Sequence, residues 1–313
     1  MKTLFVMDPL EKIQVAGDST YALMLESCDR GYEIAWCTPE DLFVQDNRAY
    51  AKATWVRVSA GAPHFRSGRT EELPMGRWDC VWMRKDPPFH MEYVFTTYLL
   101  DLAARETLVL NHPGSIKLAQ EKLFALQWPE LCPDTVFART KPVVERFARR
   151  HERIVLKPWD GNGGRGVVVT RAGDRNMGAL IELLTDEGRV SCIAQEFLPE
   201  IETVGDKRII LVDGEPRGWF LRVPGEGDHR GNMHAGASVV ACELTEADQA
   251  ICEAIGPRLK EMGLCFVGID VIGDRLTEIN VTSPTGIHEV RDLMGRDLAV
   301  DLVDASLRHR SAR

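Results

Sequence analysis

Apolar runs alternate with amphipathic stretches along the first third of the chain. Four short apolar segments have the length and composition of strands: residues 3–8, 32–38, 78–85 and 107–111. The Asp18–Thr20 segment supplies N-cap chemistry for a helix that ends near Gly31, and a second helical pattern covers Tyr93 to Arg105. Strands that alternate with helices favour a parallel sheet with right-handed crossovers. Residues 1 to about 120 are therefore predicted to form an α/β domain.

The pattern changes after this segment. A helical stretch around residues 115–128 is followed by strand-like residues 209–212 and 219–223, which flank Asp213-Gly214, a strong signal for a β-hairpin. Residues 266–272 and 276–281 flank Gly273-Asp-Arg275 in the same way, and residues 245–262 predict a helix. The second half therefore predicts an antiparallel sheet with helices.

Length and composition limit the class of protein. A chain of 313 residues allows one to three domains and can bury a core without disulfides. Its net charge of -9 disfavours a nucleic-acid reader or an anionic membrane as partner. The eight cysteines are scattered, without C-x-x-C spacing, as expected for thiols in a reducing compartment. The apolar run Leu4 to Met7 is too short for a signal peptide, so we expect a soluble cytoplasmic protein.

A glycine-rich segment, IVLKPWDGNGGRGVVVT, occupies residues 154–170. It matches neither a P-loop nor a dinucleotide-binding fingerprint. Because the glycines lead into the β-branched run Val167–Val169, we expect the loop to close a β-hairpin. Taken alone, the loop is as consistent with a flexible turn as with a phosphate site. Glycines let backbone N–H groups approach phosphate closely, and Lys157 supplies a compact charge beside them.

Three oxygen ligands stand close together in the last predicted hairpin. Glu278 and Asn280 share one face of a strand. If residues 273–275 form a three-residue loop, Asp270 stands opposite Glu278 on that face, whereas a two-residue loop would separate the two carboxylates. Leu276 is expected to shelter this face. Such a cluster suits Mg²⁺, and the alternative is a solvated, acidic strand face.

Motifs along almost the whole chain carry a resemblance to one family. They are MDPL (7–10), DST (18–20), MRKDPPF (83–89), EKL (121–123), LKPWDGNGGRG (156–166), GDKR (205–208), RGN (230–232), VGIDVIG (267–273) and LTEINVTSPTGI (276–287). MRKDPPF and TEINVTSPT are highly specific, whereas many ATP-grasp enzymes share the glycine loop. The chain closely resembles the prokaryotic glutathione synthetases, which are ATP-grasp carboxylate–amine ligases.

The resemblance implies a fold, a reaction and an assembly. It implies a Rossmann-like α/β domain (1–120), an ATP-grasp small subdomain with the glycine loop (121–198) and an ATP-grasp C-terminal subdomain (199–313), with ATP between the latter two. The implied reaction joins γ-glutamylcysteine to glycine through an acyl phosphate, giving glutathione, ADP and phosphate. It uses ATP and Mg²⁺, with Mn²⁺ as a substitute. Members of the family are homotetramers.

Site residues follow from the matched motifs. Implied contacts to ATP come from Lys122, Lys157, Gly161, Gly163, Gly164, Gln195, Glu196, Phe197, Leu198 and Asp206. Implied metal ligands are Asp270, Glu278 and Asn280. Arg208 and Arg222 would stabilise the phosphate and the tetrahedral intermediate, although either alone would be interpreted as a surface ion pair. Implied dipeptide contacts are Arg84, Asn232, Ser283 and Thr285. Residues 224–236 would form a lid, and His229 and His234 within it receive no general-base role.

Two departures and two alternatives accompany this prediction. Many family members have a cysteine at the position of Gly286, beside the implied dipeptide site, and Glu196 is often uncharged. One alternative is an ATP-grasp ligase for another acid and amine, which MRKDPPF and SPT disfavour. The other is a nucleotide-binding regulatory protein without turnover. It predicts loss of the metal ligands or arginines, yet these are all present.

Overall fold

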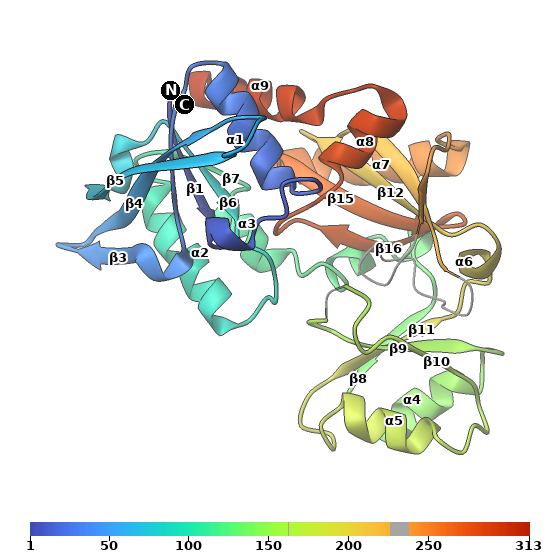
Figure 1. The fold of residues 1–313 in the computed structure, drawn as a ribbon. Coiled ribbons are helices and arrows are strands. Elements are labelled where there is room, and N and C mark those ends of the chain that lie inside the picture. Colours follow the sequence, from blue (N-terminus) through green and yellow to red (C-terminus); the bar gives the residue numbers. More distant parts are fainter. Residues whose placement is uncertain (162, 226–237) are drawn as a thin grey trace.

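The computed structural model describes residues 1–161, 163–225 and 238–313. The described residues form three β-sheets, shown along the chain in Figure 1. Two of them belong to a larger body, and the third forms a small lobe that projects from it. Within these ranges no helix is long and apolar enough to span a lipid bilayer.

The N-terminal sheet has the order β3-β4-β2-β1-β6-β7, with β5 paired to β4. The four predicted strands are parallel to one another, and helices α1 and α2 follow the predicted helical patterns. Asp18 caps α1 by accepting a hydrogen bond from the Tyr21 N–H at 2.7 Å. The elements are β1 (Lys2–Met7), α1 (Ser19–Asp29), β2 (Glu33–Cys37), β3 (Leu42–Gln45), β4 (Arg48–Val58), β5 (Phe65–Pro74), β6 (Cys80–Arg84), α2 (Met91–Ala103) and β7 (Leu108–Leu110).

The purely parallel sheet predicted here is wrong at one edge. Strands β3, β4 and β5 add an antiparallel extension that the hydrophobic pattern did not predict. Strand β5 is mostly exposed, so its sequence, FRSGRTEELP, lacks the apolar alternation of a half-buried strand.

The continuous helix predicted around residues 115–128 is also wrong. The segment contains α3 (Pro113–Leu118) and a short 3₁₀ helix, η4 (Phe124–Gln127). Between them the side-chain oxygen of Gln120 accepts hydrogen bonds from the backbone N–H groups of Lys122 and Leu123, at 3.0 and 2.8 Å. A side chain that satisfies the backbone locally competes with the helical hydrogen bonds.

The small lobe is an antiparallel sheet with the order β10-β9-β11-β8, and two helices cover one of its faces. Its own core includes Val144, Phe147, Ile154, Leu156 and Ile181. The glycine loop joins β9 to β10, which confirms the predicted hairpin. The elements are β8 (Thr135–Ala138), α4 (Lys141–Ala148), β9 (Ile154–Pro158), β10 (Val168–Thr170), α5 (Met177–Leu184) and β11 (Cys192–Glu196).

The C-terminal sheet is antiparallel, with the order β14-β13-β12-β15-β16. Both predicted hairpins are present, and positive φ angles at Asp213 (53°) and Gly214 (81°) form the two-residue turn of the first. The predicted helix 245–262 is confirmed as α7, which begins after a Thr245–Asp248 capping box. The elements are α6 (Glu200–Thr203), β12 (Asp206–Val212), β13 (Glu215–Val223), β14 (Ser238–Val240), α7 (Glu246–Glu261), β15 (Phe266–Ile272), β16 (Arg275–Asn280), α8 (Ile287–Met294) and α9 (Leu298–Ser311).

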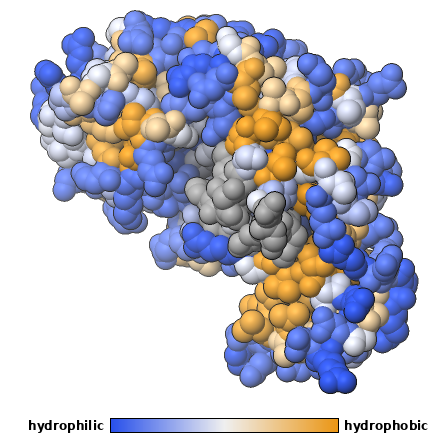
Figure 2. Space-filling model, turned by 45° about the vertical axis from the view of Figure 1, so that its right-hand side comes forward, coloured by the Kyte–Doolittle hydropathy of each residue, from blue (hydrophilic) through white to orange (hydrophobic). Residues whose placement is uncertain are grey.

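The N-terminal and C-terminal sheets are packed into one body. Two hydrophobic clusters contain buried side chains from both, and α9 packs back against α1. Asn111, next to β7, donates to the carbonyls of Phe266 and Val281 at 2.7 and 2.8 Å and accepts from the Phe266 N–H at 2.8 Å. In the space-filling view apolar residues gather where the small lobe meets this body (Figure 2). The small lobe keeps a hydrophobic core of its own.

Candidate active site

A cavity opens between the small lobe and the C-terminal sheet, and residues from both line it. It contains about 950 Å³ of empty space, part of it open to solvent. Thirteen residues predicted from the sequence line it: Lys122, Lys157, Gly161, Gly163, Gly164, Gln195, Glu196, Phe197, Leu198, Asp206, Arg222, Asp270 and Glu278. Segments that are distant in the sequence thus meet at one place.

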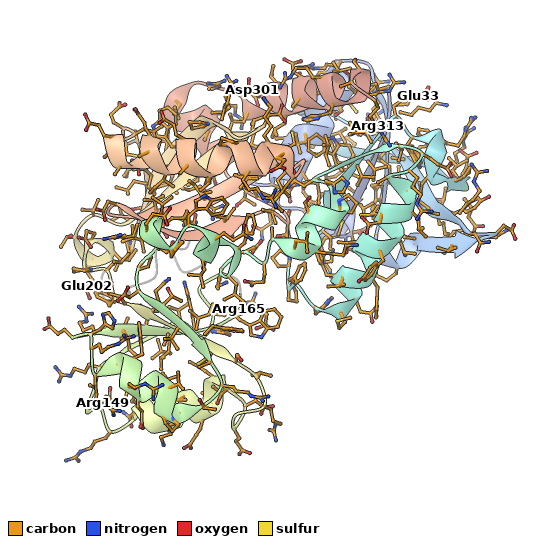
Figure 3. The ribbon with its side chains drawn as sticks, turned by 180° about the vertical axis from the view of Figure 1, so that it is seen from behind. Glu33, Arg149, Arg165, Glu202, Asp301 and Arg313 are labelled. Atoms are coloured by element: carbon orange, nitrogen blue, oxygen red, sulfur yellow. The ribbon has the colours of Figure 1, made fainter. Side chains whose placement is uncertain are left out.

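One side of the cavity is apolar. Its lining includes Val155, Val167, Phe197, Leu198, Ile201 and Ile272. The guanidinium of Arg153 lies 3.7 Å from the centre of the Phe197 ring and pairs with both carboxylate oxygens of Glu202, at 3.0 and 2.7 Å. Figure 3 shows Glu202 at the joint between the lobe and the larger body. An apolar slot of this kind suits an aromatic base.

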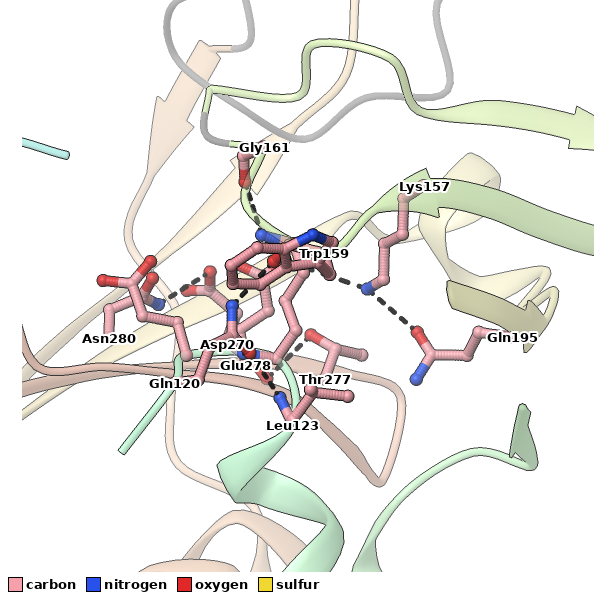
Figure 4. A network of polar contacts seen from close by, with 12 residues as sticks. Gln120, Leu123, Lys157, Trp159, Gly161, Gln195, Asp270, Thr277, Glu278 and Asn280 are labelled. Carbon is pink, nitrogen blue, oxygen red and sulfur yellow. Dashed lines mark hydrogen bonds and ion pairs between the residues drawn. The ribbon is translucent and has the colours of Figure 1, made fainter. Parts of the chain in front are cut away.

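Two lysines from different segments converge on Glu278, and Figure 4 labels one of them, Lys157. The ammonium nitrogens of Lys122 and Lys157 lie 3.6 and 3.7 Å from Glu278 Oε1. Lys157 also donates to Gln195 Oε1 at 3.1 Å, and Lys122 donates to the carbonyl of Gly161 at 2.5 Å. Burial lowers the pKa of Lys157, and the Glu278 carboxylate acts in the opposite direction. The two ammonium groups are therefore desolvated charges at the cavity wall, ready for an anionic ligand.

The glycine loop covers the cavity from the side of the small lobe. Gly163, Gly164 and Gly166 have φ angles of 63°, 72° and 72°, which favour glycine over residues with side chains. At Gly161 a Cβ atom would lie 2.5 Å from Pro158 Cγ, so any side chain there would displace the proline or the loop. Arg165, which the predicted residues did not include, also lines the cavity, and Figure 3 shows it near the joint.

The acidic hairpin reaches the predicted pairing by a different route. Of the two loop lengths that the sequence left open, the structure has the two-residue loop, since Ile272 pairs with Arg275, and the expectation that this loop would separate the two carboxylates is wrong. A β-bulge at Thr277 inserts an extra residue, and Asp270 nevertheless pairs with Glu278. Both carboxylates line the cavity. The expectation for Leu276 is also wrong, because the bulge turns it into the core with Ile279 and Val281. A bulge leaves no reliable mark in the alternation of apolar residues, so the sequence did not reveal it.

Two arginines hold the Asp270 carboxylate. Arg208 makes a two-point pair with it at 2.6 and 3.1 Å, and Arg222 lies 2.9 Å from Oδ1. Burial acts to raise the pKa of Asp270, but the two guanidinium groups outweigh it and hold the pKa below its ordinary value. Arg222 also pairs with Asp206 at 2.5 Å. Burial raises the pKa of Asp206 to about 6, although Arg222 opposes the shift.

The donor set fits a divalent ion. Asp270 and Glu278 present carboxylate oxygens to the same cavity, and the Asn280 amide lies 3.2 Å from Asp270 Oδ2. Lys122, Lys157, Arg208 and Arg222 face the carboxylates Asp206, Asp270 and Glu278. Hard oxygen ligands beside lysine and arginine side chains match a phosphate anion that arrives with its own divalent counter-ion.

A second predicted group lies on the larger body. Arg84, the last residue of β6, is buried and donates to Thr20 Oγ1 at 3.1 Å and to the carbonyl of Pro284 at 2.9 Å. Ser283 donates to the carbonyl of Arg84 at 3.3 Å. The carbonyl of Thr285 accepts a long hydrogen bond, 3.5 Å, from Arg208, which links this segment to the cavity cluster. Arg84 and Ser283 are thus brought together, while Thr285 meets Arg208 only through its backbone.

Gly286 fills a position where a side chain does not fit without repacking. Its φ angle is 128°, and a Cβ atom would lie 2.9 Å from Phe220 Cε1 and 3.2 Å from Ile210 Cδ1. The resemblance implies a cysteine at this position in many family members, and in this chain these two neighbours leave no room for its Cβ atom without a shift. Asn232, most of the predicted lid, His229 and His234 lie outside the described residues.

Other lining residues were missed by reasoning from the sequence. Val155, Pro158, Val167, Ile201, Ile272 and Thr277 line the cavity as well. Apolar residues at strand ends resemble ordinary core residues in a sequence, and only the position of the strands makes them part of the site. Thr277 lines the cavity because it is the bulged residue, and the bulge could be recognised only in the structure.

Comparisons with known proteins agree with this geometry. The model of the prokaryotic glutathione synthetase N-terminal domain matches residues 1–117, and that of the prokaryotic glutathione synthetase ATP-grasp domain matches residues 121–295. The glutathione synthetase of Agrobacterium fabrum is 44% identical over 98% of this chain and 96% of its own. That of Vibrio cholerae is 43% identical over 97% and 96%.

Solved structures share the fold at low sequence identity. A D-cycloserine synthetase superposes with a TM-score of 0.68 at 14% identity, over 98% of this chain and 99% of its own. The D-alanyl-alanine synthetase A of Vibrio cholerae superposes with a TM-score of 0.64 at 12% identity, over 99% and 98%. At such identities the likeness concerns the arrangement of the chain and leaves the choice of substrate open.

Proposed function

This chain belongs to the prokaryotic glutathione synthetase family, and from that premise we propose that it is an ATP-dependent ligase that joins γ-glutamylcysteine to glycine. The observation that carries the proposal is the convergence of the glycine loop and two lysines with the arginine–carboxylate cluster on one cavity. One wall of the cavity suits a base and the other suits phosphates. Arg222 lines the cavity, and Arg208 is joined to it through Asp270.

ATP would lie along this cavity. The adenine would occupy the apolar slot beside Phe197 and Leu198, and backbone groups of Gln195–Leu198 would meet its edge. Lys122, Lys157 and the backbone of the glycine loop would hold the phosphates, because they line the charged wall. Asp206 would keep Arg222 oriented by their ion pair. The Glu196 carboxylate lies at the rim of the base site and has no assigned chemical step.

The reaction needs charge control and positioning. A carboxylate is a poor electrophile, so its oxygen first takes the γ-phosphoryl group and ADP leaves. The glycine amine, after losing a proton, then attacks the acyl carbon, and phosphate leaves as the C–N bond is completed. Arg208 and Arg222 would stabilise the negative oxygens in both steps, since their planar guanidinium groups bind oxygen pairs.

A divalent ion would be held by Asp270 and Glu278, whose carboxylates line the cavity, and by Asn280, whose amide nitrogen donates to Asp270 Oδ2 at 3.2 Å. We propose Mg²⁺, with Mn²⁺ as a substitute, because carboxylate and amide oxygens are hard ligands. When bound, the ion would neutralise part of the negative charge on the phosphate oxygens. Arg84, Ser283, Thr285 and Asn232 are the proposed contacts of the dipeptide.

Assembly, location and domain organisation are further parts of the proposal. By family membership we expect a homotetramer in the cytoplasm, with units at residues 1–120, 121–198 and 199–313. Sedimentation equilibrium tests the tetramer, and a monomer at micromolar concentration would refute it.

The decisive experiment measures phosphate release with ATP, Mg²⁺, glycine and γ-glutamylcysteine, each omitted in turn. The proposal expects turnover only with the complete mixture and a product mass equal to glutathione. Turnover that does not need the dipeptide, or that needs another acid or amine, would identify a ligase of different specificity. Tight binding of ATP without any turnover would favour a regulatory nucleotide-binding protein.

A further inference from the structure

Gln120 occupies the break between α3 and η4, and among the described residues its side chain bonds to backbone groups alone (Figure 4). Its Oε1 accepts from the N–H groups of Lys122 and Leu123, at 3.0 and 2.8 Å. Its Nε2 donates to the carbonyl of Trp159 at 2.6 Å. The half-buried amide therefore makes hydrogen bonds at both of its ends. The oxygen accepts within its own turn, and the nitrogen donates to a segment 39 residues away in the sequence.

The first end sets the course of the backbone at Lys122. The bond from the Lys122 N–H to Oε1 takes the place of a hydrogen bond that a continuing helix would make, and the Leu123 N–H divides between Oε1 and the Gln120 carbonyl, 3.1 Å away, so the side chain supports a turn at this point. The turn brings the buried Lys122 ammonium to the cavity, where it meets the Gly161 carbonyl and Glu278. If residues 115–128 formed one straight helix, the Cα atom of Lys122 would lie elsewhere and its side chain would start from a different position relative to the cavity.

The second end fastens the base of the glycine loop. Trp159 precedes the loop, so the segment containing Gln120 holds the loop at two points: Gln120 to Trp159, and Lys122 to Gly161. The lysine is a cation that phosphate oxygens attract in competition with a neutral carbonyl. The Gln120 amide is uncharged and lies outside the lining of the nucleotide cavity, so its bond to Trp159 is independent of phosphate.

We infer that Gln120 is a positioning residue that holds Lys122 and the base of the glycine loop at a fixed separation and thereby sets the affinity for the nucleotide. The inference rests on the proposed function only in taking the cavity as a nucleotide site. It assigns no chemistry on the reacting atoms to Gln120. Loss of the bond to Trp159 should weaken nucleotide binding and leave the binding of the dipeptide unchanged.

Two variants test the two ends of the amide. Gln120→Glu keeps an acceptor for the N–H groups of Lys122 and Leu123 but places a carboxylate oxygen against the Trp159 carbonyl. Gln120→Met has nearly the same length and makes none of the three bonds. Gln249→Glu, the same change at an exposed residue of α7, is the matched control.

Calorimetric titration with Mg·ADP, without other substrates, gives the primary measurement. We expect Gln120→Glu and Gln120→Met to bind about tenfold more weakly than wild type, the factor for one lost hydrogen bond of ordinary net strength. Protonation of the carboxylate introduced by Gln120→Glu restores a donor for the Trp159 carbonyl, so the defect of this variant should shrink as the pH falls from 8 to 5.5. The Gln120→Met defect should stay constant, and Gln249→Glu should bind like wild type.

Steady-state kinetics separate positioning from simple structural damage. Positioning raises KM for ATP with little change in KM for γ-glutamylcysteine, whereas partial unfolding lowers kcat alone through the active fraction. Wild-type affinity in both Gln120 variants would overturn the inference. If Gln120→Met does not fold, Gln120→Glu decides, since it retains the bonds of the turn. Because the ADP titration needs no turnover, it remains informative even if the wild-type protein proves to act on other substrates.

Discussion

Replacing Glu278 with glutamine tests whether this carboxylate serves as a metal ligand. The change keeps the shape of the side chain and removes one negative charge. In the structure the carboxylate is the shared partner of the Lys122 and Lys157 ammonium groups, at 3.6 and 3.7 Å. The variant therefore loses a proposed ion ligand and at the same time leaves two buried cations with fewer counter-charges.

The two effects act in opposite directions on nucleotide binding. Without metal, the lysines no longer have the Glu278 charge beside them, so ATP should bind at least as tightly as to wild type. With Mg²⁺, the additional affinity that the ion gives should fall by about ten- to a hundredfold, the range seen when groups supporting a metal site are removed. The free energy of unfolding should fall by about 1–2 kcal/mol, below the cost of breaking a fully buried pair, because Glu278 is partly exposed and the contacts are longer than hydrogen bonds.

Isothermal titration with ATP, in EDTA and over a series of Mg²⁺ concentrations, measures both effects, and urea denaturation measures the stability. Glu182→Gln is a matched control, since Glu182 pairs with Lys141 at 3.0 Å on the exposed face of the small lobe. The control should not change the Mg²⁺ dependence. An unchanged Mg²⁺ dependence in Glu278→Gln would refute the proposed metal role, and weaker ATP binding in EDTA would refute the reasoning about the lysines.

Three other substitutions give separate tests. Arg222→Lys keeps the charge but loses the planar group that spans Asp206 and Asp270, so kcat should fall by about 10²–10³-fold; a fall of less than threefold would contradict the assignment. Burial raises the pKa of Asp206 to about 6, above its unfolded value, so its contribution to stability is present below about pH 4 and is lost as the pH rises through 6. Asp206→Asn should therefore gain stability relative to wild type between pH 5 and pH 7 in urea denaturation, and a constant difference would count against the shift. Gly286→Cys combines a φ of 128° with contact against Phe220 and should lower the free energy of unfolding by about 2–4 kcal/mol, whereas wild-type stability would show that the backbone relaxes there.

Some of this fold could be predicted because local chemistry and tertiary packing agree. Thr245 and Asp248 reveal the start of α7 in the sequence, and Asp213-Gly214 reveals a turn, since each signal lies within a few residues. Strand β5 could not be predicted, because it pairs with β4 through its backbone while its side chains are mostly exposed and polar, so its sequence lacks the apolar alternation of a strand that packs on a core. The break at Gln120 was missed for a similar reason: a glutamine inside an apolar pattern does not show whether its amide bonds to water or to the backbone.

In the candidate site, too, a local irregularity of the backbone could not be predicted from the sequence. From the sequence, the pairing of Asp270 with Glu278 was expected only with a three-residue loop, whereas the structure obtains it from a two-residue loop and a bulge at Thr277. Two irregularities that each shift the register by one residue have the same effect on the pairing beyond them, so the sequence pattern could not distinguish them. They differ in the direction of Leu276, which the bulge sends into the core.

The division of charges between the two lobes has a consequence for how the site works. Arg208, Arg222 and the carboxylates that orient them all belong to strands of the C-terminal sheet, which shares its core with the N-terminal sheet. Lys157 and the glycine loop belong to the small lobe, whose core is separate. A rotation of the small lobe would therefore change the distance from the phosphate contacts to the arginines without disturbing the geometry of the arginines themselves. Lys122 lies on the segment between the two bodies, and Gln120 fixes that segment to the base of the loop. Loss of the Gln120 bond and loss of Arg222 should thus affect different quantities, nucleotide affinity in the first case and kcat in the second, and their effects on kcat/KM should be close to additive.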